Sequence, residues 1–256
     1  MAKASTAAPR ATSNLPINYQ EQLAKESAAI ASRIGAPGGG DRIKSKGNQF
    51  FILPDGSEAD ELELVIVDFL SHNLFYDRVF DPKTPFPPAC FAIGAEPTTL
   101  APSKNSPSAQ ADTCTACPNN MFNSDPKGGK GKACKNTRLL AVLPGSAIDD
   151  DKVDLDLWTL SIPPAAMSFF DGYVRTLAAK HKTAPTGVIT KVTLAAGSEY
   201  FSPRFEVVRP LKVSELGTFM RRREEARARL EQEPDVTQYE PPAPRGRPAP
   251  AGKVKR

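Results

Sequence analysis

Residues 62–70 read Leu-Glu-Leu-Val-Ile-Val-Asp-Phe-Leu, a run that alternates at its start and then becomes almost continuously apolar. Alternation of apolar and polar residues with a period of two is typical of a strand with one buried face. A short continuous apolar run indicates a strand that is buried on both faces. This stretch therefore predicts a buried strand in the interior of a β-rich domain.

One further strand is predicted before residues 62–70, and several more are predicted after them. Residues 49–53 are apolar and are closed by Pro54-Asp55-Gly56, a turn signal. A helix is predicted over residues 165–182, where apolar residues recur at helical spacing. The other strands are expected at residues 138–143, 153–162, 188–194 and 204–208.

Five or six strands with one interposed helix predict a mainly β (α+β) fold, namely a small barrel of the oligonucleotide-binding type. An open sheet in an α+β domain is the alternative. The expected organisation is a flexible arm at residues 1–40 with a helix at 19–33, and a main domain at 41–212 with a polar insertion at 87–137. A charged helix at 213–232 and a disordered, basic, proline-rich tail at 233–256 complete it.

Composition excludes several classes of protein. The chain has 256 residues with 25 prolines, 17 glycines and a net charge of +4, which is only mildly basic. Apolar stretches of about 18 residues, which a membrane-spanning helix needs, are absent from the sequence. The first fifteen residues lack the apolar core of a secretory signal, so a reducing, cytoplasmic location is expected. In such a compartment, cysteines indicate metal ligands or free thiols rather than disulfides.

The four cysteines have a spacing that predicts a structural zinc site. Cys114-Thr115-Ala116-Cys117 is a two-residue knuckle, which lets two thiolates face one tetrahedral ion. Cys90 precedes this knuckle and Cys134 follows it. Residues 90–134 contain few core-forming side chains, so they cannot order themselves by apolar burial. A bound zinc contributes roughly 10–16 kcal/mol of folding free energy, which is enough to order such a segment.

Three other interpretations of the cysteines remain open. They could be buried without a ligand, or Cys114 and Cys117 could form a redox pair. A redox pair is expected to open a helix behind a strand, and Pro118-Asn119-Asn120 argues against that. His72 is the natural substitute ligand if one cysteine is not used, whereas His181 is interpreted as an ordinary surface histidine.

Basic and aromatic residues predict a site for a single-stranded nucleic acid. Lysines on and beside a glycine-rich loop can follow a phosphate backbone, and aromatic rings can stack on bases at roughly 1–3 kcal/mol each. A solvated loop and core aromatics are the simpler interpretations. The candidate contacts are Lys127, Lys130, Lys132, Lys135, Arg138, Tyr76, Arg78, Phe122 and Trp158, with Phe75, Phe80, Phe86 and Phe91 as further aromatics.

Several motifs together resemble a known group of proteins. They are Asp41-Arg42-Ile43-Lys44, Phe50–Gly56, Leu64–Phe69, Asn73-Leu74-Phe75-Tyr76, Pro87–Ala92, Cys114–Asn120 and Gly129–Asn136. The set resembles the zinc-containing single-stranded-DNA-binding, or replication-accessory, proteins of tailed bacteriophages. The likeness covers roughly residues 40–210, and its core is Pro-Pro-x-Cys, Cys-x-x-Cys-x-x-Asn and Gly-Lys-Gly-Lys-Ala-Cys.

The resemblance implies a barrel that coats single-stranded DNA during phage replication or recombination in the cytoplasm of the infected bacterium. It implies that the four cysteines bind Zn²⁺ and that Lys130, Lys132 and Lys135 contact phosphate. Replication or recombination proteins are then possible partners. Many single-strand-binding proteins end in an acidic tail that recruits proteins. This chain ends in a basic tail instead, which favours a second contact with nucleic acid.

The sequence predicts a binding protein rather than an enzyme. Gly128–Cys134 is not a nucleotide-binding loop, because no strand precedes it and no Gly-Lys-Ser/Thr is present. Asp149, Asp150 and Asp151 could bind a divalent metal but are interpreted as an acidic turn. The alternative function is a zinc-stabilised structural or adaptor protein that binds other proteins and no nucleic acid.

Overall fold

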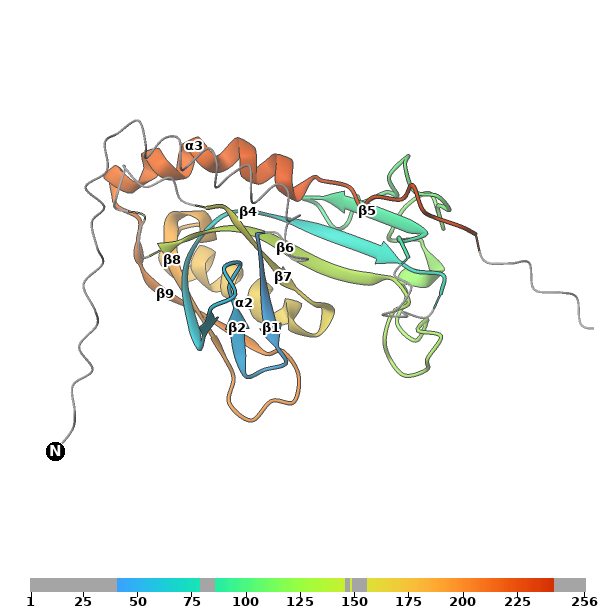
Figure 1. Cartoon of the computed structure of the whole chain (residues 1–256), viewed down its shortest axis with the longest axis horizontal. Helices are drawn as coiled ribbons and strands as arrows, with labels where there is room; N and C mark the ends of the chain where they lie inside the picture. The colour runs from blue at the N-terminus through green and yellow to red at the C-terminus, as the bar shows by residue number, and fades with distance from the viewer. Residues whose placement is uncertain (1–40, 79–85, 146–147, 149–155, 242–256) are drawn as a thin grey trace, which may run out of the picture. The chain divides into compact units, whose positions relative to one another are not determined.

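The computed structural model describes residues 41–78, 86–145, 148 and 156–241 (Figure 1). The strands are β1 (Arg42–Lys46), β2 (Phe50–Ile52), β3 (Glu58–Ala59), β4 (Glu61–Phe75), β5 (Cys90–Gly94), β6 (Lys135–Pro144), β7 (Trp158–Ile162), β8 (Val188–Leu194) and β9 (Pro203–Pro210). The helices are α2 (Met167–Thr176), which continues into a π-helical turn at Leu177–His181, and α3 (Val213–Leu230). Short 3₁₀ turns lie at Pro118–Asn120, Pro164–Ala166 and Pro185–Gly187.

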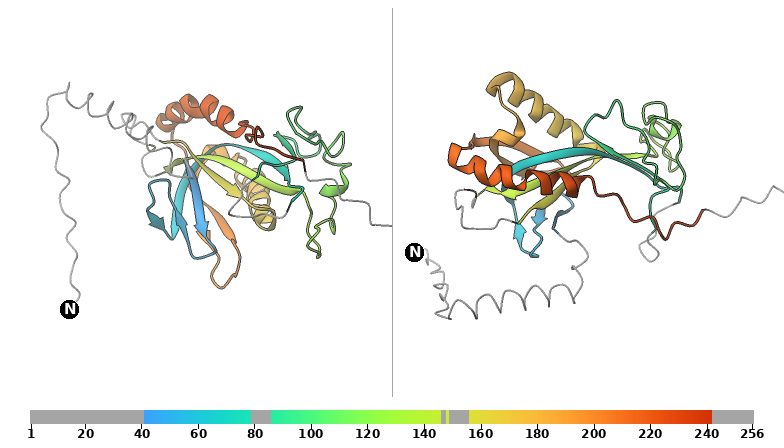
Figure 2. Two further views of the ribbon diagram at one scale, coloured as in Figure 1. Left: turned by 45° about the vertical axis from the view of Figure 1, so that its right-hand side comes forward. Right: turned by 90° about the horizontal axis from the view of Figure 1, so that it is seen from above.

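The nine strands form one mixed sheet in the order β3-β2-β1-β7-β6-β4-β8-β9, with β5 also paired to β4. All pairs are antiparallel except β1 with β7. The sheet curls around α2 on its inner face, while α3 lies along its outer face (Figure 1, Figure 2). The mainly β prediction is confirmed at this level, as a curled sheet with two helices.

Each face of the sheet has its own apolar core. Along β4, Leu62, Leu64 and Ile66 pack in the inner core with Phe170 of α2. The alternate residues Val65 and Val67 pack in the outer core, which includes Phe219, Ala226 and Leu230 of α3. Burial on both faces explains why the sequence of this strand becomes continuously apolar.

An irregularity in the β4–β6 pairing between Ile66 and Asp68 shifts the alternation by one residue. Val67 packs in the outer core with residues of α3. The carboxylate of the adjacent Asp68 also contacts α3, because its Oδ2 lies 3.3 Å from Arg227 Nη1. Beyond this bulge, Phe69 packs against the inner core and Leu70 against the outer one. The bulge therefore lets β4, which is fifteen residues long in total, pack against a core on each face both before and after it.

The predicted elements at 138–143, 188–194 and 204–208 lie within β6, β8 and β9, and the helices predicted at 165–182 and 213–232 are present as α2 with the turn after it and as α3. Strand β4 extends to Phe75, five residues beyond the predicted end, and β1, β3 and β5 were not predicted. Of the strand predicted at 153–162, residues 156–162 are described, and the strand itself, β7, begins at Trp158. Some predicted features lie outside the described residues. They are the arm at 1–40 with its helix at 19–33, Phe80, Asp149–Asp151 and the tail beyond residue 241.

The extension of β4 positions the insertion, residues 87–137. β8 pairs with β4 only at Glu61–Leu64, whereas β5 and β6 flank its far end up to Phe75. The insertion lies at this end of the sheet (Figure 1). Among the residues described, no helix is long and apolar enough to cross a membrane.

Candidate metal centre and nucleic-acid groove

The four cysteines come from three different segments. Cys90 opens β5 and pairs with Phe75 at the end of β4, while Cys134 directly precedes β6. Cys114 and Cys117 lie in the connection between these strands, and Cys117 immediately precedes the 3₁₀ turn at Pro118–Asn120. All four side chains are buried, and none forms a disulfide.

All four cysteines line one small cavity, with a volume of about 20 Å³. The remaining lining comes from the ends of β4 and β5 and from the insertion. As the side chains stand, no three His, Cys, Asp or Glu residues among those described are grouped so that they could hold a metal ion. The donor set itself, four cysteines and no competing carboxylate on the cavity wall, fits a structural zinc site.

The protonation of the thiols follows from their burial. Burial, together with the charge of the three other cysteines, raises the pKa of Cys134 to about 12, while Lys132 opposes the rise. Burial also raises the pKa of Cys114, and a hydrogen bond with Asn73 opposes that. The thiols of Cys114 and Cys134 thus favour the protonated state in the absence of a cation, and a divalent cation reverses this preference.

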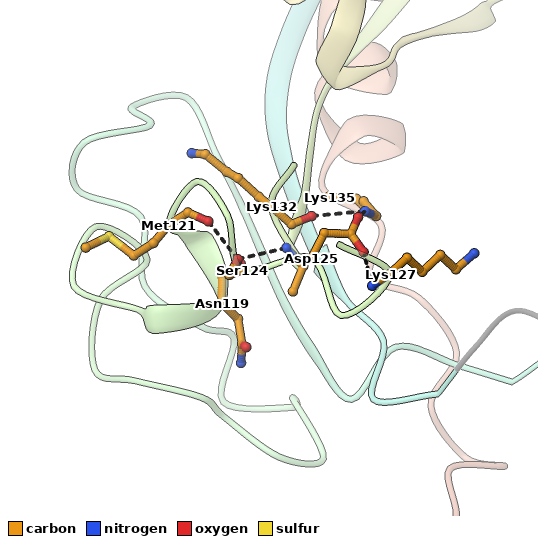
Figure 3. A network of polar contacts seen from close by, with 8 residues as sticks. Asn119, Met121, Ser124, Asp125, Lys127, Lys132 and Lys135 are labelled. Atoms are coloured by element: carbon orange, nitrogen blue, oxygen red, sulfur yellow. Dashed lines mark hydrogen bonds and ion pairs between the residues drawn. The ribbon is translucent and has the colours of Figure 1, made fainter. Parts of the chain in front are cut away.

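Hydrogen bonds hold the chain around the cysteine knuckle. The side-chain amide of Asn120 donates to the carbonyl of Cys114 at 2.7 Å, and the N–H of Cys134 donates to the carbonyl of Asn119 at 2.8 Å. The Ser124 hydroxyl accepts from the N–H of Ala133 at 3.0 Å and lies 2.6 Å from the carbonyl of Met121 (Figure 3). The polar residues that gave the insertion its low apolar content therefore satisfy its backbone groups.

The lysine loop, residues 125–135, is arranged around Asp125. Its carboxylate accepts from the Lys127 N–H at 3.0 Å and pairs with the Lys135 ammonium at 2.9 Å (Figure 3). The hydrogen bond from Lys135 is the main reason why the pKa of Asp125 is lowered. Gly128 and Gly129 have φ values of 85° and 89°, which a residue with a Cβ rarely adopts, so glycine is required here. The loop carries four lysines against this single aspartate.

A broad groove of about 1300 Å³ lies beside the cysteine cavity. Its walls come from the end of β4, the insertion and the chain after α3. The size exceeds the roughly 300–1,000 Å³ of a small-molecule pocket and suits an extended polymer. Of the nine residues predicted to contact nucleic acid, the groove brings together Tyr76, Arg78, Lys127 and Lys135.

Two aromatic rings and a guanidinium form a ladder in this groove. The rings of Tyr76 and Phe86 meet edge to face with centroids 5.9 Å apart, and the guanidinium of Arg78 lies 5.5 Å from the centre of Phe86. The side chain of Tyr76 remains 39% exposed. Arg78 Nε is 3.8 Å from Asp77 Oδ1, and both atoms are buried without a hydrogen-bond partner among the described residues. The ladder therefore offers stacking surface, while the unsatisfied Nε donor of Arg78 is buried.

The chain after α3 contributes a residue that the sequence analysis did not single out. Tyr239 lines the groove, and its hydroxyl donates to Asp77 at 2.7 Å. Glu233 accepts hydrogen bonds from Ser103 at 2.5 Å and from Asn105 at 2.6 Å. Residues 233–241, which were expected to belong to a disordered tail, thus contact the insertion and the end of β4. The low apolar content of this segment gave no signal of these contacts.

The other predicted contacts lie elsewhere. Phe122 is 72% exposed at the tip of the insertion, and the Lys132 ammonium lies 4.9 Å from the centre of its ring. Lys130 is exposed on the same loop. Arg138 lies on the inner face, where it donates to Ser71 at 2.7 Å and lies 3.7 Å from Asp171 of α2. Trp158 packs against the inner core.

Of the remaining aromatics, Phe91 is fully buried and Phe75 lines both the cavity and the groove. His72 is turned away from the cysteine cavity, because its Nε2 lies 2.8 Å from the carbonyl of Leu230 at the end of α3. It is not among the side chains that line the cavity. The candidate site is therefore defined by the cysteine cavity and the adjoining groove.

Comparison with known proteins gave no match at any level. No family model matches the chain, and no curated protein or solved structure is similar enough to count as a relative. The function is therefore argued from the site alone.

Proposed function

We propose that this chain binds single-stranded DNA without sequence preference, and that its insertion is ordered by a structural Zn²⁺ held by Cys90, Cys114, Cys117 and Cys134. The protein has no catalytic role in this proposal. Its place is phage DNA replication or recombination, in the cytoplasm of an infected bacterium. The curled sheet supports an oligonucleotide-binding-type barrel as the carrier of the site.

The zinc part of the proposal is supported by convergence of the cysteines. Three segments separated along the chain bring all four thiols to one cavity, and few other side chains fill the interior of the insertion. Zinc bound to four thiolates has no open coordination position, so it supplies cross-linking rather than chemistry. The groove beside it would then have a rigid wall.

One observation carries the DNA-binding part: the groove combines an aromatic ladder with cations. Tyr76 and Phe86 offer ring surface for bases, and Lys127 and Lys135 line the same groove and would contact phosphates. Such a combination of stacking and charge is the usual basis of sequence-independent single-strand binding. Neither element reads base edges, so no sequence preference is expected.

The test is a titration of labelled poly-dT followed by fluorescence anisotropy at two salt concentrations. The wild-type chain should bind, and its affinity should fall as salt rises, with a logarithmic slope of about −0.7 for each phosphate contacted. The double variant Lys127→Gln/Lys135→Gln should bind about tenfold more weakly, with a slope smaller by about 1.4. Arg221→Gln/Arg223→Gln on α3 removes the same charge far from the groove and serves as the control.

The alternative function, an adaptor that binds proteins, is favoured by a different surface. Val213, Leu216 and Met220 occupy one side of α3 at helical spacing and are exposed by 86%, 39% and 57%. Exposed apolar groups arranged in this way are typical of a protein contact. An adaptor would show no binding of the wild-type chain to poly-dT at any salt concentration, and that result would reject the DNA-binding proposal.

A further inference from the structure

A second charged surface lies on β1. The five residues of β1 alternate, so Arg42, Lys44 and Lys46 are exposed while Ile43 is buried in the inner core. The three cations therefore share the outer face of the strand. Residues two apart on a strand are separated by about 6.7 Å, which is comparable to the distance between successive phosphates of an extended single strand.

The strands around this row contain no opposing charge. β1, β2 and β7 read RIKSK, FFI and WTLSI and hold no acidic residue. Asp41, the nearest carboxylate in the sequence, is bound by Arg229 of α3 at 2.6 Å. Asp41 is thus neutralised by Arg229 and does not cancel the charge of Arg42 beside it.

The same surface offers ring and hydrogen-bonding groups. The Lys46 ammonium lies 5.4 Å from the centre of the Phe50 ring. The parallel pairing of β1 with β7 covers only Arg42 with Thr159 and Ile43 with Leu160, so the strands separate beyond that point. A hollow of about 310 Å³ opens there, lined on its polar side by Arg42, Lys44, Ser45 and Ser161.

The row and the groove lie close enough for their charges to interact. Burial dominates the pKa of Tyr76, which it raises, but the positive charge of Arg42 opposes that rise. Burial lowers the pKa of His72, and Arg42 lowers it further. The charge of Arg42 therefore reaches a residue that lines the groove.

We propose that the outer face of β1, formed by Arg42, Lys44 and Lys46 with Phe50, is a second binding surface for single-stranded nucleic acid. It extends the path of a strand that leaves the groove at Tyr76. This inference rests on the proposed function, because it concerns the same ligand. It adds that a short oligonucleotide fills only the groove, whereas a longer one also contacts β1.

The experiment compares the full chain with Arg42→Gln/Lys46→Gln, using oligo-dT of about five and about twenty nucleotides. Glutamine keeps the aliphatic stems and removes the charges, and Lys44, which makes another contact in the fold, is left unchanged. The variant should bind the short oligonucleotide like wild type. It should bind the long one about tenfold more weakly, with a salt slope smaller by about 1.4.

The control is Arg175→Gln/Lys180→Gln, which removes two exposed cations from α2 and the turn after it. It should behave like wild type with both oligonucleotides. Should the double variant fail to fold, Lys46→Gln alone is expected to reduce the slope for the long oligonucleotide by about 0.7.

The outcomes separate the two proposals. If wild type binds neither oligonucleotide, the proposed function is wrong. If wild type binds both oligonucleotides and the β1 variant binds the long one with the same affinity, only the second surface is rejected as a nucleic-acid site. An acidic protein would then be the partner of the β1 surface. Equal weakening on both lengths would also reject the inference, because β1 would then belong to the groove itself.

Discussion

The sheet and the insertion are held together by different means. The sheet has two cores of branched and aromatic side chains, one on each face of β4. The insertion, residues 87–137, is described throughout, and Phe91 and Leu100 are its only large buried apolar side chains. Its other buried residues are Pro88, the alanines at 89 and 92 and the four cysteines. Apolar burial can account for the order of the sheet, whereas the insertion depends on hydrogen bonds and its thiols.

This difference teaches that the two regions should respond separately to perturbation. Each hydrogen bond contributes only about 1 kcal/mol net, so a polar network alone is a weak source of order. A metal centre would act on the insertion alone, because its ligands do not reach into either core. The following experiments break or sharpen that separation.

The largest effect is expected from removal of the knuckle thiols. Cys114→Ser/Cys117→Ser should abolish binding of one zinc per chain and leave the insertion open to limited proteolysis, because the loss is a large part of the roughly 10–16 kcal/mol that such a site supplies. The far-ultraviolet circular dichroism of the sheet should change little. Elemental analysis of the purified chain measures the metal.

The matched control is Thr115→Ser/Ala116→Ser, which alters the two exposed residues between the same cysteines. It should keep the metal and resist proteolysis. Equal metal content in the cysteine variant and this control would show that these thiols are not ligands.

A smaller effect, on the sheet alone, is expected from Phe170→Ala. This ring is fully buried and meets Phe69 and Phe205 with centroids 5.1 Å and 5.5 Å apart. Its removal should lower the free energy of unfolding by about 3–5 kcal/mol in urea denaturation, with the metal content unchanged. Phe122→Ala, at an exposed position of the insertion, is the control and should alter stability by less than about 0.5 kcal/mol. A loss of metal from the Phe170 variant would contradict the independence of the two regions.

The smallest effect concerns pH. Burial lowers the pKa of His72 below its unfolded value of 6.5, so the folded state prefers the neutral ring. The resulting stability is present above about pH 6.5 and is lost as the pH falls through the folded pKa, because the unfolded chain takes up the proton first. Melting temperatures measured across this range should fall more steeply for wild type than for His72→Gln. The exposed His181→Gln should follow wild type, and identical slopes for all three chains would reject this account.

Much of the sheet could be predicted, because its strands carry a clear apolar pattern. The end of β4 could not, since Ser71, His72 and Asn73 are polar and yet buried. Each has a partner distant in sequence: Arg138 for Ser71, Leu230 for His72 and Asn136 for Asn73. Such partners are defined only by the tertiary fold, so a periodicity argument ends the strand too early.

The candidate site was predicted to a similar extent. The spacing of Cys114 and Cys117 marked the cavity, and the segment around Tyr76 and Arg78 marked one wall of the groove. The alternation in short strands did not show that Arg138 pairs with Asp171, or that Trp158 packs on the inner core. Tyr239 lies in a polar segment whose contact with Asp77 depends on where α3 ends.

The pairing of strands also sets an order of assembly during translation. β4, β5 and β6, with all four cysteines, are complete once residue 144 has left the ribosome. β1 must wait for β7, which ends at residue 162, and the other edge of β4 waits for β8. We therefore expect the nascent chain to bind the proposed zinc while β1 is paired with β2 but still lacks β7, since contacts between near residues form before distant ones.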